Sequence, residues 1–128
     1  MTVLLDTNVF VWALADRRRL SPVARAAILS TEEPRLLSPL TTYELSQKVR
    51  VGKLELPVAP AEFVRLGMES LKLTALPIDF RHTGASDRLA WHHRDPFDRL
   101  IALQAIVENV PLVSSDDEFD KYGIQRIW

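Results

Sequence analysis

The chain has 128 residues, 47 % of them hydrophobic and 26 % charged, and 16 Lys and Arg against 17 Asp and Glu leave a net charge of −1. This length suits one domain over residues 1–128, with the composition of an ordinary globular protein. The absence of cysteine excludes disulfides, thiolate catalysis and Cys-based zinc sites, and favours a cytoplasmic location. No apolar run reaches the ~20 residues of a membrane span. A polyanionic partner would have to be held by local basic patches or through bound metal.

Short β-branched and leucine-rich runs alternate with helical patterns along the chain. In chain order, we expect a strand at residues 2–6, helices at 8–15 and 22–31, a strand at 34–38, helices at 39–51 and 61–72, a strand at 73–78, helices at 80–92 and 94–109, a strand at 110–115, a helical turn at 116–122 and a last strand at 124–128. This alternation predicts an α/β fold with a central, mainly parallel sheet flanked by helices on both faces.

Two acidic residues directly follow predicted strands. Asp6 ends the first strand, and Asp116 follows the apolar run of the fourth. Open α/β sheets bind ligands beyond the carboxyl ends of their strands, so both carboxylates are expected at the same edge. Asp98 lies in the first turn of the helix 94–109, on the side that carries apolar residues one turn later. Glu44 lies early in the helix 39–51.

No local motif joins these four acids, so only the fold could bring them together. If they converge, their charges repel, and without compensation some would bind protons. A divalent cation is the natural compensator, and Mg²⁺ and Mn²⁺ prefer oxygen ligands. Such an ion can polarise a phosphoryl oxygen and lower the pKa of a bound water. No Cys₂His₂ or HExxH arrangement indicates zinc.

The same acids also have structural interpretations. Asp95 and Asp98 could cap the helix that they open. Glu44 could complete a capping box at the start of its helix, and Asp116 could cap the turn that follows it. Asp6, at the end of a buried strand, has few structural uses.

Basic and aromatic residues give weaker signals. The arginine run 17–19 could be a solvated loop or could bind a phosphate backbone. His82, His92 and His93 match no catalytic spacing, and we expect them at surface or half-buried positions. The three tryptophans are expected in the core or at interfaces.

Four segments of the chain resemble the PIN-domain family, specifically VapC-type toxins of bacterial and archaeal toxin–antitoxin pairs. The segments are LLDTNVFVW, SPLTTYELSQKVRVGKLELP, HRDPFDRLIALQA and LVSSDDEFDKYGI, and the resemblance covers essentially the whole chain. The first and third are specific in combination. The resemblance implies a PIN-like three-layer sandwich around a parallel sheet.

The resemblance also implies roles for individual residues. The acids that match the family's catalytic and metal-binding positions are Asp6, Glu44, Asp98 and Asp116. Residues expected to support these ligands are Asn8, Asp95 and Ser114. Candidate RNA-binding residues are Arg17, Arg18, Arg19 and Arg99.

The activity that the resemblance implies is that of a metal-dependent endoribonuclease, the toxin of a toxin–antitoxin pair. A water activated by Mg²⁺ or Mn²⁺ would hydrolyse RNA phosphodiester bonds and leave 5′-phosphate and 3′-hydroxyl ends. A homodimer and a cognate antitoxin, whose tail enters the acidic groove with a basic side chain, are also implied. The alternative is a non-catalytic RNA- or protein-binding domain that keeps the acids for structure. A metal-dependent phosphatase has less support, because no Asp-x-Asp pair follows the first strand.

Overall fold

The computed structural model describes residues 1–128 and has a five-stranded sheet at its centre. The strands are β1 (Val3–Leu5), β2 (Arg35–Leu37), β3 (Thr74–Ala75), β4 (Leu112–Val113) and β5 (Arg126–Ile127). Their order is β3-β2-β1-β4-β5, and every neighbouring pair is parallel. The expected α/β class with a central parallel sheet is confirmed.

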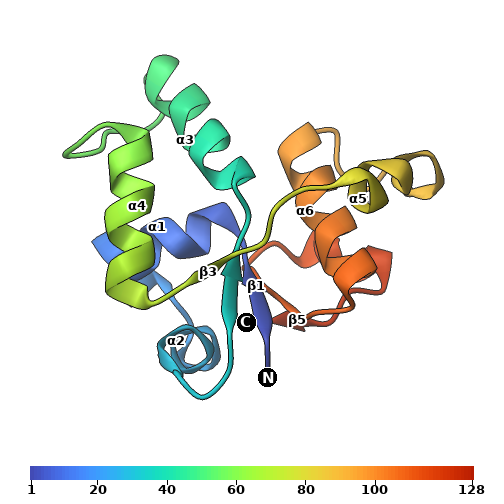
Figure 1. Ribbon diagram of the computed structural model, residues 1–128, viewed down its shortest axis with the longest axis horizontal. Helices are drawn as coiled ribbons and strands as arrows, with labels where there is room; N and C mark the ends of the chain where they lie inside the picture. Colours follow the sequence, from blue (N-terminus) through green and yellow to red (C-terminus); the bar gives the residue numbers. More distant parts are fainter.

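Alternation along the central strand divides the interior into two cores. Val3 and Leu5 pack on one side of the sheet, whereas Leu4 packs on the other. The helices α1 (Thr7–Ala15), α2 (Pro22–Leu29) and α4 (Pro60–Leu71) cover the first side (Figure 1). The helices α5 (Phe80–Gly84) and α6 (Pro96–Glu108) cover the second (Figure 1). The protein is therefore a three-layer sandwich.

The third helix, α3 (Leu40–Arg50), has a different position. It begins shortly after β2 ends and extends beyond the carboxyl edge of the sheet, beside α4 and across from α6 (Figure 1). Leu45 anchors it to the core on the α1 side. None of the helices is both long and apolar enough to cross a membrane.

The register of the sheet determines which residues meet at its carboxyl edge. Leu5 pairs with Leu37 of β2 and with Val113 of β4. The residues that follow these strands are Asp6, Ser38 and Ser114, and all three are buried. The residues that follow β1 and β4 therefore lie side by side at the carboxyl edge of the sheet, where open α/β sheets bind ligands.

The prediction of one helix over residues 80–92 is wrong. The helix α5 ends at Gly84, and only a short 3-10 turn, η2 (Ser86–Arg88), follows it. A capping box starts α5: the Asp79 backbone N–H donates to Nδ1 of His82 at 3.0 Å, and the buried imidazole fixes this short helix against the core. The chain then runs irregularly to α6. The arginine run, for which a loop was one expectation, forms the 3-10 turn η1 (Arg17–Arg19).

Candidate metal centre

Asp6 is buried, and residues from the two ends of the chain, Thr7 and Ser114, donate hydrogen bonds to it. Its Oδ1 accepts the Thr7 backbone N–H at 2.8 Å, and its Oδ2 accepts the Ser114 hydroxyl at 2.7 Å. Burial raises the pKa of the Asp6 carboxyl, and the negative charges of Glu44 and Asp116 act in the same direction. The bond from Ser114 opposes this rise. Asp6 is thus a buried carboxylate that lacks a cation of its own.

Asp116 opens the 3-10 helix η3 (Asp117–Tyr122) and faces the same edge of the sheet. Its Oδ1 accepts the Glu118 backbone N–H at 3.0 Å, so the capping interpretation holds for this residue. Its Oδ2 lies 2.8 Å from Nε2 of His93. The Asp116 backbone N–H donates to the Ser114 hydroxyl at 3.1 Å, which links Asp116 to Asp6 through one side chain.

The hydrogen bonds of Tyr122 set the orientation of the histidine. The Tyr122 hydroxyl accepts the His93 backbone N–H at 3.0 Å and lies 2.9 Å from His93 Nδ1. Its own proton can therefore go to Nδ1, and a neutral imidazole then carries its proton on Nε2. That proton is directed at Asp116, so the imidazole is a donor to this carboxylate. Each Asp116 oxygen keeps a lone pair free for a cation.

His93 was missed by the sequence reasoning. We expected an exposed or half-buried histidine, but His93 is buried, and His82 is fully buried as well. One ligand atom each from His93, Asp98 and Asp116 lies within 4.8 Å of the others. His93 lies in the same short segment as Asp95 and Asp98. This closeness in sequence is the one signal that could have indicated His93 as a site residue.

Asp98 projects from the first turn of α6 toward the other acids. Burial, together with the charges of Asp6 and Asp95, raises the pKa of Asp98 to about 7, although His93 acts in the opposite direction. The cap of α6 is Asp95, whose Oδ1 accepts the Phe97 backbone N–H at 2.8 Å. Asp95 is exposed and occupies the capping role alone, which leaves Asp98 for another function.

Glu44 lies on α3, on the opposite side of the cluster from α6. It forms no cap, because α3 has no side-chain cap and starts from Pro39, so the capping-box interpretation of Glu44 is wrong. Its Oε2 instead lies 2.9 Å from Nζ of Lys48, one turn further along the helix. The Lys48 ammonium also donates to Oδ1 of the exposed Asn8 at 3.3 Å. A cation of the chain itself therefore reaches the edge of the acidic cluster.

The four acids thus fit a divalent cation by their chemistry. They offer oxygen ligands from four separate elements, and the carboxyl pKa values of Asp6 and Asp98 are raised by burial and by neighbouring carboxylates. Repulsion of this kind costs free energy that a bound Mg²⁺ or Mn²⁺ would relieve. The donor Ser114 and the caps at Thr7 and Glu118 hold the carboxylates in place without neutralising them.

The candidate RNA-binding arginines differ in what their guanidinium groups do. Arg17 donates to the Ala13 carbonyl at 2.9 Å, and Arg18 donates to Asp16 at 3.1 Å. Arg99 donates to the carbonyls of Ala90 and Leu89, and its guanidinium lies 3.8 Å from the ring centre of the exposed Trp91. Arg19 has no such bond, and its guanidinium lies 4.8 Å from the ring centre of Trp12.

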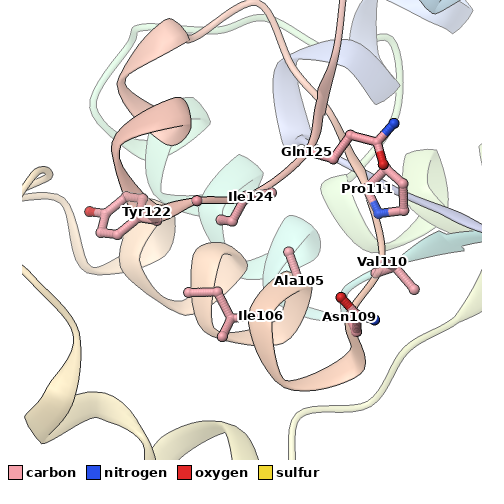
Figure 2. A pocket seen from close by; sticks show the side chains of 9 residues that line it. Ala105, Ile106, Asn109, Val110, Pro111, Tyr122, Ile124 and Gln125 are labelled. Carbon is pink, nitrogen blue, oxygen red and sulfur yellow. The ribbon is translucent and has the colours of Figure 1, made fainter.

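A separate hollow lies at the far end of α6. It has a volume of about 180 Å³ and lies against the segment that leads into β4 (Figure 2). Asp6 and Asp116, in contrast, follow the carboxyl ends of β1 and β4. No carboxylate, imidazole or cation lines it. Tyr122 is at its rim, with the hydroxyl pointing away from the hollow (Figure 2). The candidate catalytic and metal-binding groups therefore lie at the acidic cluster, and this hollow contains none of them.

Comparison with known proteins agrees with this architecture. The chain matches the PIN domain family model over residues 3–125, and it belongs to the PIN-domain family. No curated protein matches it by sequence.

Solved structures share the fold at low sequence identity. VapBC2 from Rickettsia felis, bound to a DNA fragment from its promoter, is 19 % identical with a TM-score of 0.72, and the match covers 100 % of each chain. DNA-bound VapBC from Salmonella typhimurium is 18 % identical with a TM-score of 0.70, over 98 % of this chain and 96 % of that chain. FitAcB from Neisseria gonorrhoeae is 22 % identical with a TM-score of 0.63, over 97 % and 95 %.

Proposed function

We propose that the protein is a metal-dependent endoribonuclease and the toxin of a toxin–antitoxin pair, acting in the cytoplasm. The observation that carries the proposal is the convergence of carboxylates on one edge of the sheet, with the pKa of Asp6 raised and that of Asp98 raised to about 7. Membership of the PIN-domain family supports the nuclease activity, and the toxin–antitoxin complexes of the same fold support the biological role.

Asp6, Asp98 and Asp116 would hold Mg²⁺ or Mn²⁺, with Glu44 beside them. When bound, the cation would neutralise the carboxylates, polarise a phosphoryl oxygen of the RNA and favour ionisation of a water. The chain's own residues orient these ligands: Ser114 fixes Asp6, and His93 fixes Asp116. With their orientations held in this way, the carboxylates would keep the cation in one position relative to the phosphodiester bond.

The proposal includes a homodimer and a cognate antitoxin. Tyr43 of α3 and Val51, which directly follows this helix, are 60 % and 63 % exposed. Tyr43 also packs against Phe97 of α6, with 5.6 Å between ring centres, so an apolar surface spans both helices beside the acids. A second copy of the chain would cover this surface. An antitoxin would place a basic side chain against the acidic cluster, as Lys48 does within the chain.

Cleavage of RNA in the presence and absence of metal tests the proposal. We expect the wild type to cut single-stranded RNA in Mg²⁺ or Mn²⁺, to leave 5′-phosphate and 3′-hydroxyl ends and to stop when EDTA is added. Asp98→Asn should abolish cleavage, whereas Asp87→Asn, which changes an exposed acid of η2, should not. Equal cleavage by wild type and Asp98→Asn would contradict the proposed site. Chelator-insensitive RNA binding without cleavage would support a non-catalytic domain.

A further inference from the structure

A second hollow adjoins the acidic cluster and has no role in the proposed chemistry. Its volume is about 460 Å³, within the ~300–1,000 Å³ range of small-ligand pockets. The helix α1 contributes Trp12 and Asn8 to its wall, and α3 contributes Leu45 and Lys48. Arg19 and Lys53 complete the rim. The hollow therefore has an apolar interior and a basic entrance.

Lys48 lies between this hollow and the acidic cluster. The Lys48 ammonium lies 2.9 Å from Glu44 and 3.3 Å from Asn8, so one side chain borders both places. A chain that crosses the acids along α3 would enter the hollow with its next unit. The hollow is thus placed for the part of a polymer that flanks the reacting bond.

The charges at the rim are available to a ligand. Neither Arg19 nor Lys53 has a carboxylate within 4.0 Å or a side-chain hydrogen bond, whereas Arg18 is engaged with Asp16, the one acid of the hollow. The guanidinium of Arg19 lies over the Trp12 ring, 4.8 Å from its centre. A planar, unpaired cation is therefore held in position above an apolar floor.

We propose that this hollow binds the nucleotide next to the cleaved bond of the RNA. Unstacked bases of single strands bind to aromatic rings and to arginine guanidinium planes, and their phosphates bind to Lys and Arg. Trp12 with Arg19 supplies the planar surface, and Lys53 supplies a second positive charge for the phosphate. The hollow would determine which base is accepted beside the cut. This inference rests on the proposed ribonuclease function.

Binding of single nucleotides tests the hollow without requiring cleavage or metal. We would titrate ¹⁵N-labelled protein with 5′-AMP, 5′-GMP, 5′-CMP and 5′-UMP and follow the indole N–H signal of Trp12 by NMR. Inorganic phosphate serves as the comparison ligand. We expect at least one nucleotide to shift the Trp12 signal more than phosphate does. Arg19→Ala should weaken its binding about tenfold, as expected for the loss of one stacking partner.

Arg25→Ala is the matched control, because it removes the same charge from an exposed position on α2. It should leave nucleotide affinity unchanged. The proposal is overturned if no nucleotide shifts Trp12, if phosphate has the same effect as the nucleotides, or if Arg25→Ala weakens binding as much as Arg19→Ala. The first of these results would leave the hollow as a protein-contact surface. Nucleotide binding by a protein that does not cleave RNA would refute the ribonuclease function and not the nucleotide site.

Discussion

The hydroxyl of Ser114 lies 2.7 Å from Oδ2 of Asp6, although 108 residues separate the two along the chain. They meet because β1 and β4 are parallel neighbours, with Leu5 opposite Val113. The same hydroxyl accepts the Asp116 backbone N–H at 3.1 Å. One small side chain therefore couples two of the proposed metal ligands, and its removal should affect both.

Ser114→Ala should destabilise the protein and weaken its metal site. The substitution removes a hydrogen bond to a buried carboxylate, which is worth about 1.5–3 kcal/mol of unfolding free energy. The pKa of Asp6 should rise further, because the Ser114 bond now opposes the effect of burial. Urea unfolding and Mn²⁺ calorimetry measure the two effects. Ser114→Thr keeps the hydroxyl and serves as the control; an Ala variant that matches wild type in both measurements would contradict the assigned role.

His93→Ala should weaken Mn²⁺ binding by roughly 10–100-fold, the usual effect of losing a group that orients a metal ligand. The imidazole donates to Asp116 at 2.8 Å, and without it the carboxylate can rotate away from the other acids. His93→Gln retains an N–H donor and should recover part of the affinity. Calorimetry at one pH compares the three proteins. If Gln were no better than Ala while both remained folded, donation to Asp116 would not be the function of His93.

Metal affinity should increase with pH and level off above pH 7. The pKa of Asp98 is raised to about 7, so below that pH a proton must leave before the carboxylate binds a cation. Each proton released makes the apparent affinity rise up to ~10-fold per pH unit. Mn²⁺ titrations between pH 5.5 and 8 measure this slope, and buffers of different ionisation enthalpy count the protons. A flat profile would mean that Asp98 is already ionised at low pH.

Asp98→Asn should make the metal-free protein more stable than wild type at pH 8. The folded-state pKa of Asp98 lies above the ordinary aspartate value of 3.8, so the native state holds this proton more tightly than the unfolded chain. The wild type consequently loses stability, relative to the variant, as pH rises from 4 to 7. We expect a gain of roughly 1 kcal/mol at pH 8, since solvent screens part of the repulsion. Denaturant unfolding of both proteins at pH 5 and pH 8 gives the comparison. A gap that narrows with pH would contradict the raised pKa.

The alternation of strands and helices was sufficient to predict the α/β class. Leu4 alternates with Val3 and Leu5 as a strand between two apolar layers requires, and the structure places them on opposite faces. The segment 80–92 was predicted less well. Its polar and small residues fit a helix pattern, but the chain turns after Gly84, and the buried His82 and Leu89 pack on the core without a continuous helix. Tertiary contacts, which local patterns do not contain, decide such segments.

The sequence indicated the acids that lie together and the support of Ser114, but it did not indicate that His93 and Tyr122 orient Asp116. Asp6 and Asp116 could be placed at one edge because parallel strands share their carboxyl ends. His93 could not be placed, since its partner Tyr122 is 29 residues away and only the fold brings them to 2.9 Å. The sequence also could not predict which of the three adjacent arginines is free to bind a ligand. The direction of each guanidinium depends on the 3-10 turn η1.

The most direct test of the metal centre is a Mn²⁺ titration by calorimetry on the wild type, Asp98→Asn and Asp87→Asn, at pH 8. The wild type and Asp87→Asn should bind Mn²⁺ with equal affinity, and Asp98→Asn should lose this binding while it unfolds at the same or a higher temperature. Absence of binding by the folded wild type, or equal binding by Asp98→Asn, would contradict the proposal that these distant acids form a site for a divalent cation.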